Sequence, residues 1–511
     1  MREIDKANWE FAHRLLQCVA VAFRPLRVSE LAEILSFDFQ TGPVPKFHED
    51  WCLGDPVDAV LSTTSSLLAI VDIEGSQIIQ FSHFSVREFL VSARLAETND
   101  TICRRYHISM IPAHTLGAQA CLGILLHLDR DIDSRDSLEK YLLVEYAAKH
   151  WVGHVRFKGV SGKVEDGMKR LFDSNKPHLA IWVWIYDPEC PPWNPTPQAK
   201  IPLQPRGSPL HYAAVCSLYD TVKFLLQHSQ DVNVRGFDDE LSPLHLASRE
   251  GHEDVAGLLL EHGADLTART NDGSAPLHLA SQRGHEEVAL LLLKHGADLT
   301  VRTKEGSTPL HLASQQGRQG VVCLLLEHGA DTTAQTKIGL TPLQNAVDSG
   351  REEVVRLLLE HGADSTTQLS DGSTPMRWAS EYGHAGVVLL LLEDGVSTTS
   401  QTNNGETSLH VASRRGHEEL TRLLFEHGAD ETAQTNDGST PLHSALHYGH
   451  GKVALLLLEH GADTTAQELD GRTPLHWASL RNLEEVVCSL LEHGADPTVQ
   501  TNDGSDRKSV V

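Results

Sequence analysis

Residues 271–280 read NDGSAPLHLA, residues 284–288 read GHEEV and residues 295–298 read HGAD. Copies of this unit recur through the C-terminal part of the chain. The leucine after the proline, or the residue in its place, stands at Leu210, Leu244, Leu277, Leu310, Leu343, Met376, Leu409, Leu442 and Leu475. The first interval is 34 residues and the other seven are 33, so nine units follow one another. A constant period of this length predicts a solenoid, in which each unit packs on its neighbours.

Each unit encodes a turn and two helices. Asp-Gly pairs such as Asp272-Gly273 supply the positive φ of a tight turn. The Thr-Pro that follows in most units starts a helix, with threonine as the cap and proline at the first helical position. Glycines such as Gly284 end that helix in the left-handed conformation. The second helix carries leucine triplets such as 258–260, and only a stacked neighbour can bury them.

These motifs resemble the ankyrin repeat over residues 207–505. The resemblance implies a mainly α fold, built of helix-turn-helix units with β-hairpin fingers, and a protein-binding role. It also accounts for the histidines. Twenty of the 30 occupy three fixed repeat positions, at Thr-Pro-Leu-His, Gly-His and Glu-His-Gly. We expect them to form hydrogen bonds within and between repeats and not to bind metal.

The acidic charge is concentrated in the repeats. The chain has 43 basic and 69 acidic side chains, and residues 207–511 hold 21 and 43 of them, a net charge of −22 out of −26. Such a surface repels the phosphates of nucleic acids. We therefore expect a protein partner with a basic or neutral surface, and no nucleic acid.

No catalytic motif is evident in the sequence. Residues 285–289 (HEEVA) lack the second histidine of a zinc-protease helix, and residues 159–163 (GVSGK) lack the spacing of a phosphate-binding loop. The eight cysteines form no Cys-x-x-Cys pair, which indicates a reducing compartment. Apolar runs such as 387–392 are too short to cross a membrane. We therefore expect a cytoplasmic protein without membrane contact that is not an enzyme and holds no cofactor or metal.

The first 98 residues show the pattern of a winged helix. Helices are predicted at 9–22, at 30–35 with Ser29 as cap, at 56–61 and at 85–96, with strands at 67–71 and 77–81 joined by Glu74-Gly75. Residues 24–32 (RPLRVSELA) and 81–90 (FSHFSVREFL) resemble the winged helix that follows the NACHT nucleotidase in fungal NLR-like (STAND) proteins with ankyrin arms. In that family the domain relays the state of the NTPase and does not read DNA. A net charge of −6 over residues 1–98 agrees with this.

A helical connector is predicted between the winged helix and the repeats. Helices are expected at 114–128, 138–157 and 164–172, followed by the apolar segment 179–186, and YAAKHW at 146–151 resembles the connector of the same proteins. Residues 187–206 hold seven prolines, which predicts a stiff linker. The predicted domains are therefore the winged helix (1–98), the connector (99–186), the linker (187–206) and the repeats (207–505).

Both ends of the repeat array lack the polar outer face that terminal repeats carry. Val215, Cys216 and Leu218 predict that the first repeat docks on the connector. The last repeat has Leu480 and Leu483, and the sequence stops one finger into a tenth unit, so we expect fraying or truncation there.

Three functions stay open from the sequence. The leading hypothesis is the partner-recognition arm of an NLR-like fungal sensor. No Walker A loop occurs in this chain, so a nucleotide switch does not carry over from the resemblance. The chain would then be a truncated relative or an incomplete gene product. The alternatives are an adaptor scaffold that tethers a partner and a fragment of a larger NTPase-containing signalling protein.

Repeats five to eight depart most from the repeat consensus. Gln344 and Arg377 replace the motif histidine, Asn345 and Trp378 replace leucine, and Asp394 replaces the histidine of Glu-His-Gly. Aromatic and arginine side chains dominate binding hot spots. Neutral drift among duplicated repeats would explain the departures equally well. The partner-binding residues predicted on this basis are Asp348, Arg377, Trp378, Glu381, Tyr382, Arg414, Arg415, His447 and Tyr448.

Overall fold

The structure is a computed structural model that describes residues 9–51, 55–64, 67–73, 75–128, 132, 136–189, 205–228 and 230–502. The chain forms two compact units, residues 1–247 with 252–265 and residues 248–251 with 266–511. Most of the predicted linker (190–204), Glu74 of the predicted hairpin turn and the chain beyond Asn502 lie outside the described residues.

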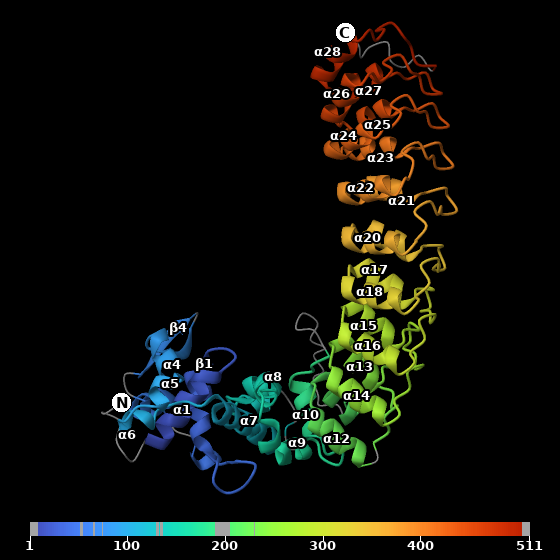
Figure 1. The fold of residues 1–511 in the computed structure, drawn as a ribbon. Coiled ribbons are helices and arrows are strands. Elements are labelled where there is room, and N and C mark those ends of the chain that lie inside the picture. Colours follow the sequence, from blue (N-terminus) through green and yellow to red (C-terminus); the bar gives the residue numbers. More distant parts are fainter. Residues whose placement is uncertain are drawn as a thin grey trace. The chain divides into compact units, whose positions relative to one another are not determined.

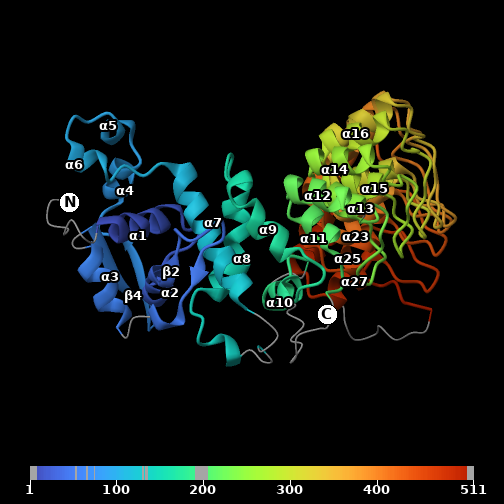
Figure 2. The ribbon, with the colours of Figure 1, turned by 90° about the horizontal axis from the view of Figure 1, so that it is seen from below.

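The N-terminal part has the helices and the three-stranded sheet of a winged helix. Its elements are α1 (Trp9–Val21), β1 (Leu26–Arg27), α2 (Val28–Glu33), η1 (Ile34–Ser36), β2 (Phe37–Asp38), β3 (Lys46–Phe47), η2 (Glu49–Trp51), α3 (Pro56–Thr64), β4 (Leu68–Ile73), β5 (Ser76–Phe81), α4 (Phe84–Leu90) and α5 (Ala93–Ala96). The sheet order is β1-β5-β4, antiparallel throughout, with Ile79 of β5 opposite Leu26 and Ile70. Helices α1, α2 and α3 lie around this sheet (Figure 2). The predicted hairpin and the three preceding helices are confirmed.

The predicted cap of the second helix was wrong. Helix α2 begins at Val28, and Arg27 is its N-cap residue in place of Ser29. Glu30 explains the shift, because its carboxylate accepts a hydrogen bond from the Arg27 main-chain N–H (2.7 Å) and is paired with the guanidinium of Arg24 (2.8 Å). The carboxylate thus makes the reciprocal bond of a capping box, from N3 to the main-chain N–H of the N-cap residue.

The single helix predicted over residues 85–96 was also wrong. Helix α4 ends at Leu90 and α5 begins at Ala93, because Ser92 between them is extended (φ −75°, ψ 148°). The β2–β3 pair was not predicted. Each of its strands has two residues, which is too short for an alternating pattern to appear in the sequence.

The connector is helical as predicted, but the helix expected at 138–157 begins only at Val144, after a separate turn at 136–138. It contains α6 (Thr101–Arg104), α7 (Met110–His127), η4 (Asp136–Leu138), α8 (Val144–Val155), η5 (Ser161–Lys163), α9 (Glu165–Leu171) and α10 (His178–Ile185). Its core is aromatic, with buried Trp151 and Trp182 edge to face at 5.2 Å. The indole N–H of Trp182 donates to the main-chain oxygen of Ala148 (2.8 Å), so the ring is buried without losing its hydrogen bond.

The first repeat packs on the connector. Its helices are α11 (Pro209–Val215) and α12 (Tyr219–Gln227), and α13 (Pro243–Glu250) and α14 (Glu253–Glu261) follow. Helix α12 contacts α9, as Figure 2 shows, and Cys216 and Leu218 are buried. The hydroxyl of Ser161 donates to the carboxylate of Asp220 across this interface (2.6 Å). The predicted docking of the first repeat is confirmed.

The remaining repeats are stacked helix pairs with their fingers on one side (Figure 1). Their helices are α15 (Pro276–Arg283), α16 (Glu286–Lys294), α17 (Pro309–Gln316), α18 (Gln319–Glu327), α19 (Pro342–Asp348), α20 (Glu352–Glu360), α21 (Pro375–Tyr382), α22 (Ala385–Glu393), α23 (Ser408–Arg415), α24 (Glu418–Glu426), α25 (Pro441–His447), α26 (Gly451–Glu459), α27 (Pro474–Leu480) and α28 (Glu484–Glu492). Thr308 and Pro309 cap and start α17 as predicted, and Gly317 ends it at φ 69°.

Neighbouring fingers are joined through their main chains. Gly273 has φ 84°, and a side-chain Cβ there would lie 2.9 Å from the main-chain nitrogen of Lys304 in the next finger. The Lys304 N–H donates to the carbonyl of Asp272 (2.7 Å). Glycine is therefore needed at this finger both for its backbone angle and for the close approach of the next turn.

Candidate interaction surface

The nine predicted binding residues lie at the first helices of repeats five to eight. Asp348 ends α19, four residues belong to α21, Arg414 and Arg415 end α23, and His447 ends α25 with Tyr448 as its C-cap residue. Because the repeats are 33 residues long, two sets share equivalent positions. These sets are Asp348, Glu381, Arg414 and His447, and Tyr382, Arg415 and Tyr448.

The second set forms an exposed stripe, by which we mean Tyr382, Arg415 and Tyr448. Their side chains are 55%, 54% and 56% exposed, respectively. Stacked helices lie about 8–10 Å apart, so the stripe presents one such side chain per repeat. In the other repeats this position carries Cys216, Glu250, Arg283, Gln316, Ser349 and Arg481. Two large aromatic side chains at this position are therefore particular to repeats six and eight.

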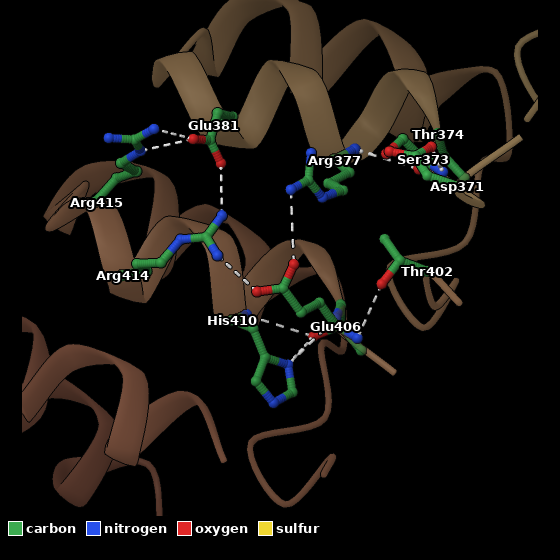
Figure 3. A network of polar contacts seen from close by, with 11 residues as sticks. Asp371, Ser373, Thr374, Arg377, Glu381, Thr402, Glu406, His410, Arg414 and Arg415 are labelled. Carbon is green, nitrogen blue, oxygen red and sulfur yellow. Dashed lines mark hydrogen bonds and ion pairs between the residues drawn. The ribbon is translucent and has the colours of Figure 1, made fainter. Parts of the chain in front are cut away.

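An ion network lies beside the stripe and joins repeats six and seven (Figure 3). Glu381 of α21 accepts hydrogen bonds from Arg414 (2.9 Å) and from Nε of Arg415 (2.7 Å). Arg414 also pairs with Glu406 (2.6 Å), and Glu406 lies 3.6 Å from Arg377. The positive and negative charges within the network largely balance one another. Its main effect is therefore to hold the two repeats in register, and it leaves little unpaired charge for a partner.

Two pKa values reflect this arrangement. Burial opposes ionisation of Glu381, but hydrogen bonds from Arg415 and Arg414 outweigh it and hold the pKa of its carboxyl below the ordinary value. The negative charge of Asp348 raises the pKa of Tyr382. Tyr382 is therefore an uncharged hydrogen-bond donor at neutral pH, as a tyrosine in a binding surface usually is.

Arg377 differs from the histidine that it replaces. In repeat four, Nδ1 of His311 accepts the Thr308 main-chain N–H (3.2 Å) and Nε2 donates to the carbonyl of Leu340 (3.0 Å). A guanidinium has no acceptor, so Arg377 cannot make the first bond. Its Nε is buried and has no hydrogen-bond partner among the described residues.

Two of the other departures, Gln344 and Asp394, have structural explanations. Gln344 accepts the Thr341 main-chain N–H (2.9 Å) and donates to the carbonyl of Thr367 (2.9 Å), as the motif histidine would. Asp394 accepts a hydrogen bond from the hydroxyl of Ser365 in the preceding loop (2.6 Å). These residues need no partner to account for them.

The stripe ends beside a fixed indole. His447 stacks on Trp477 with ring centroids 4.2 Å apart, and the indole N–H donates to Glu468 (2.9 Å). Trp378, by contrast, is only half-buried on α21. Tyr448 therefore stands at the end of a helix whose last turn is held by aromatic packing.

Sequence reasoning missed Glu406 and Trp477. Glu406 stands where four of the other eight repeats carry serine, as Ser307 and Ser439 do, so its acidic side chain was a usable signal. Trp477 sits in repeat nine, outside the repeats singled out. Its contact with His447 is set by packing between repeats and has no sequence signal of its own.

The structural role predicted for the repeat histidines is confirmed at many positions. For example, Nε2 of His285 donates to the carbonyl of Arg249 in the preceding repeat (2.9 Å). Arg318 replaces this histidine in the next repeat and makes the equivalent bond to Gln282 (3.1 Å). Among the described residues, no three His, Cys, Asp or Glu side chains gather as a metal site would require. Nor does that part of the chain contain a helix long and apolar enough to span a bilayer.

Comparison with protein families matches both parts of the chain. The family model described as "Ankyrin repeats (3 copies)" matches residues 196–270, 267–336, 331–402, 394–468 and 434–501, together more than half of the chain. The model described as "GPI inositol-deacylase, winged helix domain" matches residues 4–100. The N-terminal domain is thus a winged helix of a NACHT-associated type.

Individual relatives share only parts of the chain. "Azaphilone pigments biosynthesis cluster protein L" of Monascus ruber is 28% identical over 277 residues, which cover 52% of this chain and 57% of the relative. Human "Palmitoyltransferase ZDHHC13" is 42% identical over 64 residues, 12% of this chain and 10% of that protein. "Palmitoyltransferase AKR1" of Lachancea kluyveri is 40% identical over 60 residues, 12% and 8% respectively. The two palmitoyltransferase matches are confined to the repeats and do not indicate an enzyme.

Proposed function

The chain belongs to the ankyrin-repeat family, and from that premise we propose that it recognises a protein partner through the exposed stripe of repeats six to eight. The observation that carries this proposal is the pair of half-exposed tyrosines, Tyr382 and Tyr448, on either side of Arg415. Tyrosine and arginine are enriched in hot spots because they bury a large area and still form hydrogen bonds. The network around Glu381 fixes the helices, so the stripe loses little entropy when a partner binds.

We propose a smaller contact site than the nine residues predicted from the sequence. Tyr382, Arg415 and Tyr448 are the residues proposed to touch the partner. In this proposal, Asp348, Arg377, Glu381, Arg414 and His447 support them through the contacts described above, and half-buried Trp378 is not assigned a contact. A partner with a neutral or basic surface agrees with the net charge of −22 over residues 207–511.

The experiment is quantitative capture with the full chain. The captured partner is identified, and its affinity is compared between the wild type and a Tyr382→Ala/Tyr448→Ala variant. Removal of one hot-spot residue costs about 2 kcal/mol or more, which weakens binding by about 30-fold or more. Since the effects of two hot spots do not simply add, we expect the double variant to bind at least about 30-fold more weakly than the wild type. Tyr219→Ala is the matched control, because Tyr219 is also exposed but lies in the first repeat. Unchanged affinity in the double variant would refute the proposed surface.

We further propose that the chain acts as the recognition arm of an NLR-like fungal sensor. The order of winged helix, connector and repeats supports this assignment, as does the type of winged helix. Transcript sequencing upstream of Met1 tests it. We expect the transcript to encode an in-frame phosphate-loop domain. A transcript that lacks this domain, in cells where the chain still binds its partner, would contradict the sensor proposal.

An adaptor scaffold is the alternative that a specific observation favours. Helix α4 of the winged helix exposes Phe84 (70%) and Phe89. Exposed aromatic side chains on a second domain would suit a second partner. The Phe84→Ser variant tests this alternative. Loss of a second captured protein, while the partner of the repeats stays bound, would favour the adaptor.

A further inference from the structure

A cavity of about 420 Å³ lies between α1 of the winged helix and α7 of the connector, within the first unit. The two helices pack side by side (Figure 2). Trp9, His13 and Gln17 line it from one face of α1, and Thr115 lines it from α7. Most of the cavity is thus formed by two regular helices, and Gln40 and Lys163 complete its wall.

A cation lines this cavity without a carboxylate partner. The guanidinium of Arg14 lies 5.7 Å from the ring centroid of Phe11 and 5.1 Å from that of Phe39. It makes no hydrogen bond or ion pair with any other residue that the structure describes. Aromatic rings that hold a guanidinium in place prepare it for an anion, because little side-chain entropy is lost on binding.

Two more charged side chains line the cavity, one cation and one carboxylate. Lys163 of η5 is exposed at the cavity and forms no ion pair within the described part of the chain. Glu10 also lines the cavity and is exposed to solvent. The cavity therefore has a net positive charge, in a chain whose net charge is −26.

Gln17 adds a neutral polar group to the cavity. The residue is 8% exposed and lines the cavity, and no residue of the described chain forms a hydrogen bond with its amide. The amide atoms are not among the buried polar atoms without a partner, so they are open to the cavity. A bound hydroxyl group could form hydrogen bonds with this amide without displacing a protein partner.

The remaining polar groups can accept hydrogen bonds. Nε2 of His13 donates to the carbonyl of His107 (3.2 Å), and burial lowers the pKa of His13, so Nδ1 is a free acceptor at neutral pH. The hydroxyl of Thr115 donates to the carbonyl of Ile111 (2.7 Å), which leaves its lone pairs free to accept. The cavity thus combines cationic donors with acceptors suited to hydroxyl groups.

We propose that this cavity binds a small hydroxylated organic anion. Arg14 and Lys163 bind its oxyanion, and Gln17, His13 and Thr115 bind its hydroxyl groups. The volume falls within the range of about 300–1,000 Å³ typical of small-molecule sites. The site is separate from the repeats and from the partner proposed for them, and it does not depend on that proposal.

Calorimetric titration of the full chain tests the proposal with three probes. Glucose 6-phosphate and gluconate carry a phosphate and a carboxylate, respectively, and glucose carries neither. We expect one or both anions to bind with a Kd of about 1 mM or below, and glucose to bind at least about tenfold more weakly. The stronger of the two anions identifies the oxyanion that the site prefers. Equal binding of glucose, or no saturable binding of either anion up to about 10 mM, would overturn the proposal.

Variants locate the binding. Arg14→Gln should weaken the anion at least about tenfold, because it removes a charge-assisted hydrogen bond. Arg94→Gln, on exposed α5, is the matched control and should change nothing. Lys163→Gln and Gln17→Leu keep the test valid if Arg14→Gln fails to fold, since Lys163 is exposed and Leu matches the size of Gln. Wild-type affinity in both of these variants would place the anion elsewhere and refute the site.

Discussion

Replacing His311 with glutamine should leave the repeats almost as stable at neutral pH and should make them less sensitive to acid. His311 is buried and makes two hydrogen bonds to main-chain groups, one as acceptor and one as donor. Gln344 occupies the equivalent position in the next repeat and makes two bonds of the same kind. Leucine at position 311 could make neither.

The magnitudes follow from these bonds and from the pKa of the imidazole. His311→Leu leaves a buried N–H and a buried C=O unpaired, at about 1–3 kcal/mol each, whereas His311→Gln should cost less than about 1 kcal/mol. Burial lowers the pKa of His311 to about 4, from 6.5 in the unfolded chain. The unfolded state therefore binds a proton that the folded state does not. The free energy of unfolding that depends on neutral His311 is fully present above about pH 6.5. It falls by about 1.4 kcal/mol per pH unit as the pH drops from 6.5 toward 4.

Urea unfolding followed by circular dichroism, at about pH 7.5 and about pH 5, measures both effects. At the lower pH the wild type should lose about 2 kcal/mol more than His311→Gln does. Gln344→Leu is the matched control and should be destabilised as much as His311→Leu. A glutamine variant that unfolds with the leucine variant, or that is as acid-sensitive as the wild type, would refute the reasoning.

Three further outcomes are expected. Ser314 has a buried hydroxyl with no hydrogen-bond partner in the described chain, whereas that of Ser380 donates to a carbonyl (2.8 Å). Ser314→Ala should therefore leave the urea midpoint unchanged or raise it, and Ser380→Ala should lower the free energy of unfolding by about 1 kcal/mol; equal losses would contradict this. Gly273→Ala should cost more than Gly296→Ala, at least about 1 kcal/mol more, because both have a φ near +85° but only the first Cβ would meet the next finger; equal unfolding free energies would argue against that contact. Amides of residues 472–495 should exchange with solvent faster than those of repeat four, as measured by mass spectrometry, and equal protection would rule out fraying of the last repeat.

The repeats could be predicted from the sequence almost completely. Thr308, Pro309 and Gly317 each act through local backbone chemistry, so their roles can be predicted from the sequence of a single repeat. The docking of the first repeat could also be predicted, because Cys216 and Leu218 are apolar where the inner repeats carry polar residues.

The proposed interaction surface could be predicted only in part. The stripe was found because Tyr382 and Tyr448 interrupt a repetitive background. The ion network could not be predicted in full, because the pairing of Glu406 with Arg414 depends on how a finger approaches the helix after it. Likewise, the prediction of Ser29 as the N-cap residue was wrong, because the sequence does not show that the carboxylate of Glu30 accepts a hydrogen bond from the Arg27 main-chain N–H.

Photo-cross-linking to the partner tests the central claim most directly. A photoreactive side chain is placed in turn at positions 382, 415 and 448 of the full chain, and at the exposed finger residues Ile338 and Leu469 as controls. Stripe recognition predicts that the same partner is cross-linked from all three stripe positions and from neither finger. Cross-linking from Ile338 and Leu469, with none from the stripe, would contradict it.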